Sequence, residues 1–144
     1  MIAIDTNVLL RYLLNDDPKQ SKKASAVIQS SQKVLITDVV LVETIWRLKG
    51  EKYNLGKEDI VQVISALFEE LTICFEDGQS VWRALVDYKN AKSINSGGEQ
   101  KTVDFPDALI INKSNFASKD LGEILECVYT FDIAAQELSG MMAP

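Results

Sequence analysis

Short apolar runs alternate with longer amphipathic segments along this chain, and this alternation limits its fold more than any other feature. The short runs cover residues 1–4, 34–37, 72–75 and 127–131. The longer segments have helical spacing and cover residues 8–14, a stretch that begins at Pro18, 38–49, 57–71, 78–90, 105–116 and 133–138. Strands that alternate with helices predict an α/β fold, with a central, mainly parallel sheet flanked by helices in an α/β/α sandwich. With 144 residues, we expect a single domain over 1–144.

Two segments do not fit this alternation. Residues 91–103 are polar and contain Gly97-Gly98, so we interpret them as a flexible loop. Residues 112–126 form a second long, polar stretch.

The chain contains no histidine, which excludes Ser-His-Asp and Cys-His catalysis and histidine metal sites. Its two cysteines, Cys74 and Cys127, lie far apart in apolar runs and predict reduced, buried thiols rather than a zinc site. No run of about 18 apolar residues is present, and the N-terminus lacks a basic region, so we expect a cytoplasmic protein that crosses no membrane.

Carboxylates follow the expected strands. Asp5 comes directly after the first apolar run and Asp132 directly after the last, so both are expected at one edge of the sheet, where such folds bind ligands. The alternative for each is helix capping, because Asp accepts hydrogen bonds from free backbone N–H groups. We assign Asp38 and Asp77 to capping alone.

Three further acids lie on expected helices. Glu43 falls within VVLVETIW, where an ionised carboxylate is costly unless it is paired, for example with Arg47, or bound to a metal. Asp104 and Asp107 are three residues apart at the start of a helix and so share one face, although capping explains either of them equally well.

Together these acids form a candidate site for a hard divalent cation such as Mg²⁺ or Mn²⁺, which prefers oxygen ligands. Clustered carboxylates would repel one another without a cation. The candidate metal ligands are Asp5, Glu43, Asp104, Asp107 and Asp132.

Four motifs resemble those of PIN-domain proteins, in particular the VapC-type toxins of toxin–antitoxin pairs. They are MIAIDTNVLLRYLLNDDP, VVLVETIW, DFPDALI and VYTFD, which occur in the family's order and span nearly the whole chain. The resemblance implies a PIN fold and a Mg²⁺- or Mn²⁺-dependent endoribonuclease. It also implies a cognate antitoxin and a homodimer.

By motif, the resemblance implies that Asp5, Glu43 and Asp107 are core metal ligands, that Asp132 is a further catalytic acid, and that Asp104 lies at the edge of the site. Thr6 and Thr130 would support these acids, although ordinary backbone hydrogen bonding explains both as well. Asn7 would also be a supporting residue, against the alternative that it only shapes the turn. The segments 91–103 and 112–126 depart from the family pattern and leave the substrate and the partner open.

Arg11, Arg47 and Lys49 are candidates to bind the RNA backbone, against the alternative of solvated surface charge. The net charge of −6 argues against a general nucleic-acid-binding surface. An antitoxin-independent PIN nuclease of RNA processing and a PIN-like module that binds RNA or protein without cutting both remain alternatives. A haloacid-dehalogenase-type phosphatase is excluded, because it needs an Asp where this chain has Asn7.

Overall fold

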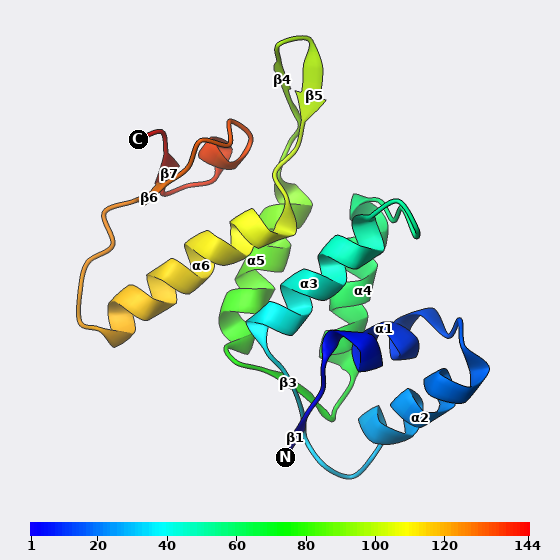
Figure 1. Ribbon diagram of the computed structural model, residues 1–144. Helices are drawn as coiled ribbons and strands as arrows, with labels where there is room; N and C mark the ends of the chain where they lie inside the picture. The colour runs from blue at the N-terminus through cyan, green and yellow to red at the C-terminus, as the bar shows by residue number, and fades with distance from the viewer. The chain divides into compact units, whose positions relative to one another are not determined.

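The computed structural model describes residues 1–144 and contains two compact units, residues 1–78 and 79–144, which are described in turn. The first unit is built on a three-stranded parallel sheet of β1 (Ile2–Ala3), β2 (Val34–Ile36) and β3 (Ile73–Phe75) (Figure 1). β2 lies in the centre and pairs through Val34 with both Ile2 and Ile73. The expected α/β fold with a mainly parallel sheet is confirmed.

Four helices accompany this sheet: α1 (Thr6–Leu14), α2 (Pro18–Ile28), α3 (Asp38–Lys49) and α4 (Lys57–Glu69). Asp17 caps α2 and accepts hydrogen bonds from the backbone N–H groups of Lys19 and Gln20. Asp38 was expected to cap α3, and this was wrong. The cap is Thr37, whose hydroxyl accepts from the Val40 N–H, and Asp38 lies in the first turn, where its charge suits the helix dipole.

The helical spacing explains the core of this unit. α4 buries Ile60, Ile64 and Leu67 at intervals of three and four residues. α1 buries Leu9 and Leu10, whereas Leu13 and Leu14 at its end are only half-buried. The hydroxyl of Tyr12 on α1 donates to the Glu70 carboxylate at the end of α4, and burial, followed by this hydrogen bond, raises the pKa of Tyr12 to about 12.

The second unit contains α5 (Gly78–Asn90), whose first residue belongs to the first unit, and α6 (Phe105–Asp120). A hydrogen bond from Asn112 joins these two helices, because its Nδ2 donates to the Asp87 carboxylate over 2.7 Å. The buried rings of Tyr88 and Phe105 also meet edge to face, with their centroids 6.0 Å apart. α6 is four residues longer than the expected 105–116.

The segment 91–103 was expected to be a flexible loop, and this was wrong. It forms a hairpin of β4 (Ile94–Ser96) and β5 (Glu99–Lys101), with Gly97 and Gly98 as the two-residue turn (Figure 1). Both glycines have positive φ, 61° and 81°, which is the backbone that a two-residue type I′ turn requires. The side chains of Ser93 and Thr102 share a hydrogen bond of 2.6 Å at the base of the hairpin.

The last apolar run was expected to add a fourth strand to the central sheet, and this was also wrong. β6 (Val128–Tyr129) pairs in parallel with β7 (Met141–Met142) in a separate two-stranded sheet. A single 3-10 turn at Ala135–Glu137 replaces the expected helix over 133–138. Cys127 lies directly before β6, next to the paired residues of this small sheet. Both cysteines are free thiols, half-buried rather than fully buried. None of the helices is long and apolar enough to cross a membrane.

Candidate functional site

The turn after β1 brings the first acidic motif into contact with the second. Asp5 caps α1, and its Oδ1 accepts from the Val8 N–H over 2.9 Å, which leaves Oδ2 available. The next residue, Thr6, is 5% exposed and donates its hydroxyl to Glu43 Oε2 over 2.6 Å. The capping explanation of Asp5 is therefore correct, and the adjacent Thr6 connects this turn to Glu43.

Glu43 lies on α3 with its side chain 46% exposed. The sequence predicted that Glu43 lies in apolar surroundings, where its charge would be costly unless paired or bound to a metal. This was wrong, because the face of α3 that carries Glu43 is open to solvent and also exposes Val39 and Trp46. They line a shallow hollow together with Val42 and Glu43. The carboxylate of Glu43 is thus reachable from solvent and is not a buried charge.

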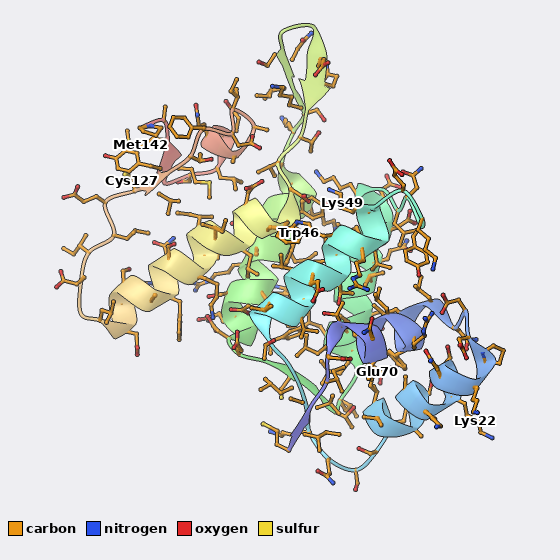
Figure 2. All side chains as sticks on the ribbon, viewed as in Figure 1. Lys22, Trp46, Lys49, Glu70, Cys127 and Met142 are labelled. Atoms are coloured by element: carbon orange, nitrogen blue, oxygen red, sulfur yellow. The ribbon has the colours of Figure 1, made fainter.

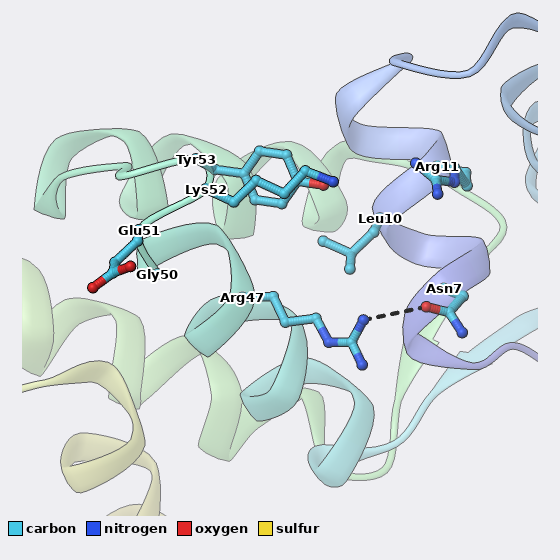
Figure 3. A pocket seen from close by; sticks show the side chains of 8 residues that line it. All are labelled: Asn7, Leu10, Arg11, Arg47, Gly50, Glu51, Lys52 and Tyr53. Carbon is cyan, nitrogen blue, oxygen red and sulfur yellow. Dashed lines mark hydrogen bonds between the residues drawn. The ribbon is translucent and has the colours of Figure 1, made fainter.

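Arg47 connects the remaining residues of the two motifs. Its Nη2 lies 3.3 Å from Glu43 Oε1, the ion pair that the sequence offered as an alternative for Glu43. Its Nη1 donates over 3.3 Å to Oδ1 of Asn7 on α1 (Figure 3). Asn7 therefore does more than shape the turn, because it helps to hold the guanidinium group.

The third acidic motif forms a capping box at the start of α6, in the second unit. Asp104 Oδ1 accepts from the Phe105 N–H over 2.8 Å, and Asp107 Oδ2 accepts from the Asp104 N–H over 3.2 Å. The two side chains lie one turn apart on one helical face, as the spacing predicted. Both are half-buried.

The fourth motif forms a local turn. Asp132 Oδ1 accepts from the N–H groups of Ala134 and Ala135 over 2.8 and 3.1 Å, and the Thr130 hydroxyl accepts from the Asp132 N–H over 3.0 Å. Because β6 is not part of the three-stranded sheet, the shared sheet edge that was to join Asp132 to Asp5 does not exist. The role of Asp132 remains a prediction from its motif.

These residues fit a divalent cation by their chemistry, since all candidate ligands are carboxylate oxygens, which Mg²⁺ and Mn²⁺ prefer. Within neither unit do three acidic or thiol side chains come together as a complete metal site. The first unit instead supplies a partial one. Asp5 offers a free oxygen, and the Glu43–Arg47 contact is long for a charged hydrogen bond and can yield to a cation.

Two of the three cations proposed for RNA binding line one cavity. Arg11 and Arg47 border a hollow of about 330 Å³, together with Lys52 and Tyr53 from the turn after α3 (Figure 3). Arg11 is held by Asp16 through an ion pair of 2.8 Å, and this hydrogen bond lowers the pKa of the Asp16 carboxyl and raises the pKa of the guanidinium. Lys49 does not line the cavity.

One acid that the sequence gave no special role takes part in this region. Glu76, directly after β3, accepts the Asp38 N–H over 2.9 Å and so caps the start of α3 from a neighbouring strand. The signal for it was its position after a parallel strand. The hydrogen bond between Glu76 and Asp38 therefore connects the carboxyl end of β3 to the start of α3, the helix that carries Glu43. β2 and β3 pair in parallel, so their carboxyl ends lie side by side.

Comparison with known proteins identifies a family whose fold agrees with this architecture. No curated protein and no solved structure matches the chain. The family model of the PIN domain matches residues 2–138. PIN domains are generally nucleases and typically use divalent metal ions. Because the match covers nearly the whole sequence and the sheet is parallel, as the motifs implied, this chain belongs to the PIN domain family.

Proposed function

We propose that this chain is a Mg²⁺- or Mn²⁺-dependent endoribonuclease that hydrolyses RNA phosphodiester bonds, and that it is the toxin of a toxin–antitoxin pair. The observation that carries the proposal is the hydrogen bond of 2.6 Å from Thr6 to Glu43, which joins the first two acidic motifs. The PIN-domain match supports the nuclease class. The toxin role, a cytoplasmic location, a homodimer and an antitoxin partner rest on the VapC-like motifs.

Each residue of the first unit has a distinct part in the proposed reaction. Asp5 and Glu43 are the cation ligands, because each keeps a carboxylate oxygen that is free or weakly engaged. A divalent cation in such a site supplies an activated water and offsets phosphoryl charge. Thr6 and Arg47 position Glu43, and with no histidine in the chain, a carboxylate accepts the proton of the attacking water. The proposal also keeps three further acids as candidate metal ligands, because they belong to the third and fourth motifs: Asp104, Asp107 and Asp132.

The decisive variant is Asp5→Asn, because asparagine caps a helix as well as aspartate does and removes only the charge. Asp17→Asn is its matched control, since Asp17 caps α2 in the same way and is not among the proposed cation ligands. We expect purified protein to cleave RNA with Mn²⁺ or Mg²⁺ and not with EDTA. We expect Asp5→Asn and Glu43→Gln to lower kcat by about 100-fold or more, and Asp17→Asn to leave it unchanged.

Asp107→Asn tests the third motif and keeps an acceptor for the capping box. A comparable loss of kcat supports its place among the cation ligands. Cleavage that survives Asp5→Asn, or that continues in EDTA, would contradict the proposal. Folded protein that binds RNA and never cuts it would identify a binding module instead.

A further inference from the structure

The cavity next to Arg47 has the composition of a nucleotide subsite. It lies between α1 and the turn after α3, and three cationic side chains and one acidic side chain line it, Arg11, Arg47 and Lys52 against Glu51. Figure 3 shows the Arg47 guanidinium reaching across toward Asn7, with Leu10 above it in the view and the Lys52 and Tyr53 side chains farther up. At about 330 Å³, the cavity has the size of a small-molecule site.

We propose that this cavity binds one nucleotide of single-stranded RNA next to the bond that is cut, with Arg47 and Lys52 on its phosphate and Tyr53 on its base. The inference rests on the proposed nuclease function and assigns its substrate subsite. The cavity adjoins the acidic motifs directly, because Asn7 follows Asp5 by two residues and Arg47 contacts Glu43.

The cations differ in how strongly they are already engaged. Arg11 makes two hydrogen bonds to Asp16 and one to Gln20. It therefore lines the cavity but has fewer N–H donors left for a phosphate. Arg47 uses two of its five N–H donors, both at 3.3 Å, and keeps the others for a phosphate. Lys52 is exposed and forms no ion pair, and its flexible stem lets the ammonium group reach an anion.

Tyr53 distinguishes a nucleotide from other anions. The Lys52 ammonium lies 5.2 Å from the centroid of its ring, a loose contact that a bound phosphate can replace. Unpaired bases stack on such rings, whereas the Asp and Glu side chains of an acidic peptide carry no aromatic group that could stack there. The combination of a phosphate-binding cation and a ring therefore favours RNA over an acidic peptide.

The test measures binding apart from cleavage. The probe is a fluorescent single-stranded oligoribonucleotide of about ten nucleotides, titrated with the full chain in EDTA. The variants are Lys52→Gln and Tyr53→Leu. Tyr53→Phe keeps the ring, and Lys22→Gln removes an equal charge from the exposed side of α2, well away from α3 (Figure 2).

We expect Lys52→Gln to weaken binding severalfold and to reduce the salt slope of the binding constant by about 0.7. We expect Tyr53→Leu to weaken it by at least about fivefold, the lower end of the cost of a lost base stack, and Tyr53→Phe and Lys22→Gln to bind like the original chain. In cleavage assays Lys52→Gln and Tyr53→Leu should raise KM without lowering kcat, and Tyr53→Phe and Lys22→Gln should keep the KM of the original chain.

Equal effects of Lys52→Gln and Lys22→Gln would overturn the proposal, and so would stronger competition by polyglutamate than by unlabelled RNA. Failure of the subsite is separable from failure of the nuclease proposal. A chain that cuts RNA with metal but ignores Lys52→Gln and Tyr53→Leu is a nuclease without this subsite. A chain that binds RNA through both residues but never cuts it keeps the subsite and loses the nuclease.

Discussion

The hydroxyl group of Thr6 ties the first turn of α1 to Glu43 on α3, and it is almost inaccessible to solvent. Threonine is a poor choice for a helix on propensity alone, so its value here lies in the hydroxyl. The sequence suggested Thr6 through the Asp-Thr-Asn motif but gave no partner for it. The partner is 37 residues away in the chain, and no local pattern contains that information.

We expect Thr6→Val to lower kcat while Thr6→Ser restores it, because valine keeps the shape and removes the donor, whereas serine keeps the donor. The lost hydrogen bond frees the Glu43 carboxylate, and such a bond to a charged group contributes about 1.5–3 kcal/mol. The measurement is kcat of the three proteins, with thermal unfolding as the check on the fold. Equal activity of the serine and valine variants would mean that the hydroxyl does not position Glu43.

At the scale of elements, helix boundaries were predictable from the helical spacing of the apolar residues, even where the capping residue was assigned wrongly. The bounds of α3 and α5 match the expected 38–49 and 78–90 residue for residue. Strand partners were not predictable in this way, since an apolar run shows that a strand exists and not what it pairs with. The hairpin of β4 and β5 was missed because its residues are polar and mostly exposed. Without a buried face, the sequence shows no alternation of apolar and polar residues that would indicate a strand.

The hairpin gives a prediction about its turn. At Gly97, φ is 61° and no atom lies within 4 Å of an added Cβ, so only backbone conformation opposes a side chain there. We expect Gly97→Val to destabilise the hairpin by about 1–2 kcal/mol and Gly97→Asn to be nearly neutral, because asparagine tolerates this region.

Amide hydrogen exchange across residues 94–101 measures this difference. The rest of the chain should exchange as before, since the hairpin contributes no fully buried side chain to either core. Equal exchange in the valine and asparagine variants would show that backbone strain does not control this turn.

At the scale of the whole molecule, the 144 residues carry 21 acidic against 15 basic side chains, so any added salt relieves repulsion to some extent. A specific cation site must therefore be separated from this general effect. A ligand that binds only the folded state stabilises it in proportion to the logarithm of its concentration over Kd, by about 2.7 kcal/mol at 100 times Kd. We expect Mn²⁺ or Mg²⁺ to raise the Tm of the original chain above the Tm in NaCl of equal ionic strength.

The variants assign that rise to particular residues. Asp5→Asn and Glu43→Gln should abolish the specific part of the shift, because they remove the two proposed cation ligands of the motifs that the Thr6–Glu43 hydrogen bond connects. Asp17→Asn removes the same charge from an equivalent cap, and Glu69→Gln removes an exposed charge at the end of α4, so both should keep the shift. Scanning calorimetry of the five proteins measures this without any RNA. If all four variants lose the shift equally, the cation acts by screening the net charge, and the oxygen pair of Asp5 and Glu43 is no metal site.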